Sequence, residues 1–167
     1  MRRPGKAQGT HDQEKLPSGR DPPGGKATAL ICYLDSSVVL RHVFGEPHPL
    51  QEWTKIKQGF SSRLLRLECF RTIDRIRLRG GLSAEEVSER FSALHRLLDH
   101  LGLLPLTARV MDRAELGMNL PLGTLDGIHL ATALLWREKQ GADFVFATHD
   151  RELGLAARSQ GLEVIGI

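Results

Sequence analysis

The sequence of 167 residues lacks the features that mark secreted and membrane-bound proteins. It has only two cysteines, Cys32 and Cys69, without CxxC spacing, so we expect reduced, buried thiols rather than a disulfide or a zinc site. No apolar run approaches the roughly 20 residues that a membrane-spanning helix needs. Residues 1–27 also lack the apolar middle of a secretory signal. These absences predict a cytoplasmic protein that does not associate with membranes.

Several common catalytic motifs are missing as well. There is no GxxxxGK phosphate loop and no GxSxG nucleophile elbow, which excludes P-loop ATPases and typical serine hydrolases. An aspartyl-phosphate phosphatase would place a second acid two residues after a first-strand aspartate such as Asp35. That position holds Ser37, which argues against this class.

The net charge of +3 does not by itself indicate a nucleic-acid partner. Residues 1–27 contain six basic and three acidic side chains, which leaves 17 of each in the rest of the chain. Any affinity for RNA must therefore depend on where the charges lie. Residues 1–27 are rich in Gly, Pro, Lys and Arg and are predicted to be a disordered basic tail, with one folded domain at 28–167. The tail is either a weak, salt-dependent contact for a polyanion or a solvated extension.

The residues from Ala29 to Leu34 form an unbroken apolar run that stops at Asp35. A run with no polar face indicates a strand buried on both sides in a parallel sheet. Ser36 or Ser37 is expected to cap the helix that follows. Because ligands bind at the carboxyl ends of such strands, Asp35 is a candidate functional residue, with a turn or cap role as the alternative.

The rest of the chain alternates between helical and strand patterns. This order predicts an α/β fold, a three-layer αβα arrangement with a central, mainly parallel sheet. A capping box at Ser83 and Glu86 and a cap at Thr124 are expected to begin two of the helices. Further strands are expected at 59–61, 103–106, 143–148 and 163–165, and helices at 50–57, 62–79, 83–100, 107–116, 124–140 and 151–160.

Four carboxylates occupy positions that this fold would bring to one edge of the sheet. Asp35 and Asp150 follow predicted strands, and Asp126 lies in the first turn of the helix that leads to the second of these strands. Glu68 lies on the border of the apolar face of its helix. A capping role is the alternative for Asp35 and Asp150, and a helix-dipole role for Asp126. Pairing with Arg71 is the alternative for Glu68.

Four segments resemble the PIN-domain ribonucleases, most closely the VapC-type toxins of bacterial toxin-antitoxin pairs. They are YLDSSVVL, SSRLLRLECFR, LDGIHLATALL and FVFATHDRELGLAARSQGLEVIG, and the resemblance covers about residues 30–167. It implies a PIN-like fold, an RNA substrate cut to leave a 5′-phosphate and a 3′-hydroxyl, and a cognate antitoxin as partner. The acidic site that the resemblance implies consists of Asp35, Glu68, Asp126 and Asp150, with Ser37 and Thr148 as supporting hydroxyls.

The clustering of four carboxylates has a chemical reason. Two carboxylates about 4 Å apart repel by ~4 kcal/mol at an effective dielectric constant of 20, and a divalent cation reverses the sign of that cost. An all-oxygen site suits Mg²⁺ or Mn²⁺. We therefore expect Asp35, Asp126 and Asp150 to hold one or two Mg²⁺ ions, while Glu68 completes the site or orients the attacking water.

Arginines on the helix that carries Glu68 modestly support a polyanionic substrate. Arg71 is taken as a supporting residue, and the alternatives are a solvated basic face or contacts with an acidic partner. His129, one turn after Asp126, is expected to face solvent, with RNA contact as the alternative. The arginines are Arg63, Arg66, Arg71, Arg75, Arg77 and Arg79.

Two further expectations concern assembly and the rival function. A homodimer is expected because the resembling toxins are commonly dimers, and the helices between residues 50 and 100 offer faces for it. The alternative to an endoribonuclease is a catalytically inactive PIN-like module that binds RNA or protein. The presence of all four acids argues against that alternative.

Overall fold

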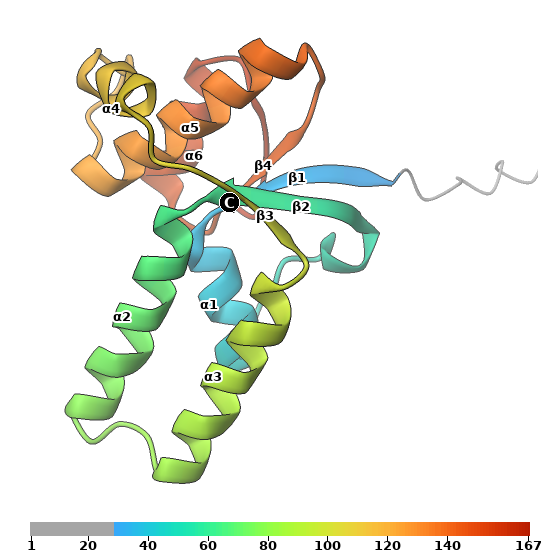
Figure 1. The fold of residues 1–167 in the computed structure, drawn as a ribbon. Helices are drawn as coiled ribbons and strands as arrows, with labels where there is room; N and C mark the ends of the chain where they lie inside the picture. The colour runs from blue at the N-terminus through green and yellow to red at the C-terminus, as the bar shows by residue number, and fades with distance from the viewer. Residues whose placement is uncertain (1–28) are drawn as a thin grey trace, which may run out of the picture.

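The computed structural model describes residues 29–167, so the prediction of a disordered tail at 1–27 lies outside the described residues. Five strands form one sheet in the order β3-β2-β1-β4-β5, and every neighbouring pair is parallel (Figure 1). The predicted parallel sheet is confirmed, with the first strand at its centre. The strands are β1 (Leu30–Leu34), β2 (Ile56–Ser62), β3 (Leu101–Leu104), β4 (Val145–Ala147) and β5 (Glu163–Ile165).

Six helices cover the two faces of the sheet and form the two outer layers of the predicted αβα arrangement. Three of them, α1, α2 and α3, pack against one face, while α4, α5 and α6 pack against the other (Figure 1). The three-layer prediction is therefore confirmed. The helices are α1 (Ser36–Phe44), α2 (Leu64–Leu78), α3 (Ala84–Leu98), α4 (Ala108–Glu115), α5 (Thr124–Gln140) and α6 (Arg151–Ser159).

The unbroken apolar run of β1 follows from its place between two helical layers. Successive side chains of a strand point to opposite faces of the sheet. Tyr33 and Phe146 belong to the core beneath α4, α5 and α6, whereas Leu34 and Ala147 belong to the core above α1, α2 and α3. Both faces are covered, so neither set of alternate positions in β1 needs polar side chains.

The segment at 50–57 corrects the sequence prediction of a helix. Only a short 3₁₀ turn, η1 (Trp53–Lys55), forms there, and β2 already begins at Ile56 instead of residue 59. Ile56 pairs with Leu30 of β1, so this stretch joins the parallel ladder. Pairing with a distant strand has overridden the local helical pattern, which is a frequent outcome for short segments.

Two of the predicted helix caps are also corrected. Asp35 itself caps α1, because its side chain accepts the backbone N–H of Ser37. Gly123 occupies the cap position of α5 in an extended conformation, and Thr124 is the first helical residue. The capping box that begins α3 is confirmed, with both of its hydrogen bonds formed.

The prediction of reduced, buried cysteines is confirmed. Cys32 and Cys69 are free and buried, and burial is the main reason that the pKa of the Cys32 thiol rises to about 12. None of the described helices has the length and apolar character needed to cross a membrane.

Candidate active site

The carboxyl ends of β1 and β4 meet because these two strands pair in parallel, with Leu34 opposite Ala147. Asp35 follows β1 directly and is only 4% exposed. Its Oδ2 accepts hydrogen bonds from the Ser37 hydroxyl at 2.6 Å, from the Ser37 backbone N–H at 3.2 Å and from the Thr148 hydroxyl at 3.0 Å. The Asp35 carboxylate is therefore fixed at the edge of the sheet by groups from both neighbouring strand ends.

The same two hydroxyl side chains also hold the loop that carries Asp150. The Thr148 hydroxyl accepts the backbone N–H of Asp150 at 2.9 Å, and the Ser37 hydroxyl accepts that of His149 at 2.9 Å. Asp150 caps α6, because its Oδ1 accepts the N–H of Leu153 at 2.9 Å. The structure thus places Ser37 and Thr148 between the Asp35 and Asp150 positions.

Asp126 is brought near the other carboxylates by the first turn of α5. Its pKa rises from 3.8 to about 6, first because the group is partly desolvated and then because the charges of Asp150 and Asp35 oppose its ionisation. Glu68 adds a smaller effect in the same direction, and His129 acts against it. The other three predicted carboxylates, Asp35, Glu68 and Asp150, thus all help to raise the pKa of Asp126.

Glu68 makes a different contact from the one expected. Its Oε2 lies 2.7 Å from Nε2 of His129, and His129 is fully buried, so the prediction that this histidine faces solvent is wrong. Arg71 does not pair with Glu68. Its guanidinium is exposed and lies 3.4 Å from the Asp74 carboxylate. Among residues 29–167 it makes no ion pair with the four carboxylates.

Tyr33 contacts the other ring nitrogen of His129. Its hydroxyl oxygen lies 2.8 Å from Nδ1 of His129 and accepts the backbone N–H of Ser62 at 3.1 Å. Sequence analysis missed Tyr33 and expected His129 to face solvent, although a signal for their contact existed. Tyr33 and Asp35 share one side of a strand, His129 and Asp126 share one side of a helix, and a buried tyrosine hydroxyl usually needs a partner.

The donor set of the four residues is compatible with a hard divalent cation. All donors are carboxylate oxygens, which suit Mg²⁺ or Mn²⁺ better than zinc. As placed, Asp35, Glu68 and Asp150 are hydrogen-bonded to separate neighbours. Within the described part of the chain, no three histidine, cysteine or acidic side chains are grouped tightly enough to hold a metal ion.

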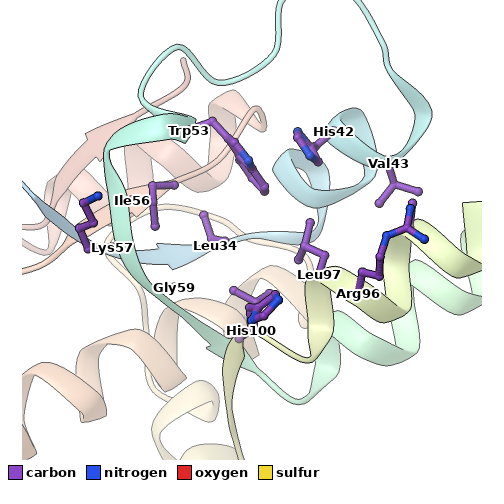
Figure 2. Close-up of a pocket in the computed structure, with 12 residues that line it drawn as sticks. Leu34, His42, Val43, Trp53, Ile56, Lys57, Gly59, Arg96, Leu97 and His100 are labelled. Atoms are coloured by element: carbon purple, nitrogen blue, oxygen red, sulfur yellow. The ribbon is translucent and has the colours of Figure 1, made fainter.

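A cavity of about 450 Å³ lies apart from this acidic edge, among α1, α3 and the start of β2 (Figure 2). The Trp53 ring stacks on His42 with 4.0 Å between the ring centroids, and Lys57, Arg96 and His100 also line the cavity. Neither acidic side chains nor any of the four predicted carboxylates line it. Its basic and apolar walls do not suit a cation, so we place the candidate active site at the edge of the sheet.

Comparison with known proteins identifies the family of this chain. The model of the PIN domain family matches residues 32–158, a range that includes all four carboxylates. The chain belongs to the PIN-domain family. Ribonuclease VapC46 of Mycobacterium tuberculosis strain H37Rv is 34% identical over 137 residues, which cover 80% of this PIN domain protein and 95% of the relative. Ribonuclease VapC47 of M. tuberculosis strain CDC 1551 is 31% identical over 138 residues, which cover 78% and 93%.

Solved structures share the fold of this PIN domain. FitAcB from Neisseria gonorrhoeae matches with a TM-score of 0.60 and 17% identity, over 81% of this chain and 96% of the other. VapBC2 from Rickettsia felis, bound to a DNA fragment from its promoter, matches with a TM-score of 0.56 and 16% identity, over 81% and 97%. At these identities the likeness establishes the fold alone.

Proposed function

We propose that this PIN domain is a Mg²⁺-dependent endoribonuclease, the toxin of a toxin-antitoxin pair. The observation that carries the proposal is that Ser37 and Thr148 hold the Asp35 carboxylate and the loop of Asp150 together at one edge of the sheet, and the charges of Asp150 and Asp35 help to raise the pKa of Asp126 there. Gathering like charges destabilises a protein unless a cation offsets their repulsion, so such clusters are typical of functional sites. The names of the two mycobacterial relatives, both ribonucleases, support RNA as the substrate.

Asp35, Asp126 and Asp150 would hold one or two Mg²⁺ ions, for which Mn²⁺ would substitute. The bound metal would supply a more acidic water and withdraw charge from the phosphate under attack. Ser37 and Thr148 keep the Asp35 carboxylate oriented through its Oδ2. This donor set supports the proposal because hard cations prefer carboxylate oxygens in fixed orientations.

Glu68 would orient the attacking water. One of its oxygens, Oε2, is engaged by His129, so Oε1 is the oxygen that would accept a hydrogen bond from the water. The Glu68 side chain is 17% exposed, which leaves room for such a contact. Cleavage would then leave a 5′-phosphate and a 3′-hydroxyl.

A groove next to the N-terminal end of α2 supports a protein partner, the cognate antitoxin. It has a volume of about 400 Å³, and its rim carries the cations of Arg63 and Arg66. Its apolar part includes Leu67 and Leu106, which are 58% and 43% exposed. Apolar side chains beside cations suit an acidic amphipathic segment. We further propose that the toxin is a cytoplasmic homodimer.

The test is cleavage of RNA by the purified protein with Mg²⁺ and with EDTA. We expect Asp35→Asn and Asp126→Asn to lower cleavage by at least on the order of 100-fold without unfolding the protein, since metal sites are sensitive even to changes around the ligands. Glu89→Gln, an exposed carboxylate on α3, is the matched control and should keep full activity. Wild-type protein that binds RNA but does not cut it would favour the catalytically inactive binding module.

A further inference from the structure

A buried chain of three side chains connects the central strand with two helices directly next to the acidic edge. Tyr33 of β1 contacts His129 of α5 at 2.8 Å, and His129 contacts Glu68 of α2 at 2.7 Å. Tyr33 and His129 are both fully buried. Burying polar groups is unfavourable unless they are hydrogen-bonded. The two contacts therefore restrict how β1, α5 and α2 can be arranged.

The protons of this chain can be assigned from its partners. The Tyr33 oxygen already accepts the N–H of Ser62, and a phenol keeps its proton near neutral pH, so its O–H is directed at Nδ1 of His129. The lone pair of Nδ1 accepts this hydrogen bond. The other ring nitrogen, Nε2, therefore carries a hydrogen and donates it to Oε2 of Glu68.

The ring of His129 is held in place by more than these two hydrogen bonds. Tyr33, which orients it, stacks on Phe146 with ring centroids 4.9 Å apart and meets Phe60 edge-on at 5.4 Å. The Tyr33 and His129 rings themselves meet nearly at right angles, with centroids 6.0 Å apart. Because this packing fixes the His129 ring, its Nε2–H can be reached by Glu68 in only a few side-chain orientations.

We propose that His129 is a positioning residue that fixes the Glu68 carboxylate through its Nε2–H, with Tyr33 setting the orientation and tautomer of the ring. The inference rests on the proposed function, in which Glu68 orients the attacking water. His129 touches neither the substrate nor the reacting atoms. By holding Oε2, it leaves Oε1 as the oxygen that is available to the attacking water.

The test compares two substitutions of nearly equal shape. His129→Gln retains an N–H donor near the position of Nε2, whereas His129→Met fills the same space without one. We expect His129→Met to lower kcat about 10- to 100-fold with little change in KM, as for removal of a group that orients a site residue. His129→Gln should recover kcat to within a few-fold of wild type.

A double-mutant cycle with Glu68→Gln shows whether His129 acts through Glu68. We expect His129→Met to cause no further loss of kcat when Glu68→Gln is already present, because residues that act as a unit are non-additive. Wild-type kcat in His129→Met, or losses that simply multiply in the double variant, would overturn the proposal. Equal losses in His129→Gln and His129→Met would overturn it as well, since they would indicate a packing role.

The ring proton gives a readout that needs no catalysis. Nitrogen NMR of the histidine rings in the metal-free protein should place the proton of His129 on Nε2, and Tyr33→Phe should change this signal. A proton found on Nδ1 would overturn the proposal. Absence of RNA cleavage by the wild-type protein would overturn the proposed function alone, because the NMR measurement tests the Tyr33, His129 and Glu68 contacts without substrate.

Discussion

Thr148 donates a hydrogen bond from its hydroxyl to the Asp35 carboxylate at 3.0 Å, although the two residues are 113 positions apart in the sequence. The same hydroxyl accepts the backbone N–H of Asp150 at 2.9 Å. Thr148 is fully buried, so water cannot replace either bond. One hydroxyl group thus fixes the positions of two of the four candidate carboxylates relative to each other.

Replacing Thr148 with valine tests this coupling, because valine keeps the shape and removes the hydroxyl. We expect Thr148→Val to lower the free energy of unfolding by about 1–3 kcal/mol, since the buried Asp35 carboxylate loses a donor and the Asp150 N–H loses its acceptor. Under the proposed function, affinity for Mn²⁺ should fall about 10- to 100-fold. Urea unfolding and a Mn²⁺ titration measure the two effects. Thr148→Ser is the control that keeps the hydroxyl, and a valine variant equal to wild type in both measurements would contradict the coupling.

The pKa of Asp126, raised to about 6, predicts how the stability of the cation-free protein depends on pH. A raised carboxyl pKa means that the native state favours the protonated form, so this contribution to stability is present below pH 3.8 and is lost as pH rises to about 6. The Asp126→Asn side chain stays neutral at every pH. The melting temperature of this variant minus that of the wild type should therefore increase between pH 4 and pH 6.

Thermal unfolding in EDTA at pH values from 4 to 7 measures this gain. Asp112→Asn, which removes an exposed carboxylate of α4, is the control and should show no such trend relative to the wild type. A difference between Asp126→Asn and wild type that does not change with pH would contradict the assignment.

Gly166 follows the last strand and packs against the residue that holds the site together. It has a φ of 96°, and a Cβ there would lie 2.5 Å from the backbone oxygen of Thr148. We expect Gly166→Ala to lower the free energy of unfolding by at least about 1–3 kcal/mol, because both the backbone conformation and the contact are unfavourable. Gly117→Ala, where a Cβ meets open space, should change it by less than about 0.5 kcal/mol. Denaturant unfolding of both variants makes the comparison.

The arginines of α2 are not equivalent in their distance from the site. Arg79 follows Glu68 by 11 positions, or about 16 Å along a helix. Arg63 and Arg66 lie at the N-terminal end of α2, closer to Glu68. We expect Arg63→Ala and Arg66→Ala to weaken RNA binding and to reduce its salt dependence by about 0.7 logarithmic units per lost phosphate contact. Arg79→Ala is the matched control. Binding is measured at several salt concentrations in the Asp35→Asn background, and equal effects of all three variants would contradict the expectation.

Sequence patterns predicted best those features that depend on neighbours in the chain. The apolar run before Asp35 predicts a doubly covered strand because strand pleating acts over two residues. The Ser83 and Glu86 capping box is likewise local, since both hydrogen bonds lie within four residues. The edge position of Asp35 and Asp150 could be predicted because parallel strands end on the same side.

The features that were missed depend on packing between distant segments. The 50–57 segment has a helical pattern, yet Ile56 pairs with Leu30, a contact that no local pattern encodes. The local sequence around His129 does not show that Tyr33 and Glu68, from distant segments, contact its ring. Arg71, the alternative partner considered for Glu68, pairs with Asp74 instead.

The order of strands in the sheet has a consequence for the protein during its own synthesis. β1 is made first, but the neighbour that completes its carboxyl edge, β4, comes only at Val145–Ala147, followed by Thr148 and Asp150. A chain still growing on the ribosome has Asp35 without the segment that orients it. For a protein proposed to cut RNA, the proposed metal site therefore cannot form on the nascent polypeptide before β4 and Thr148 have been synthesised.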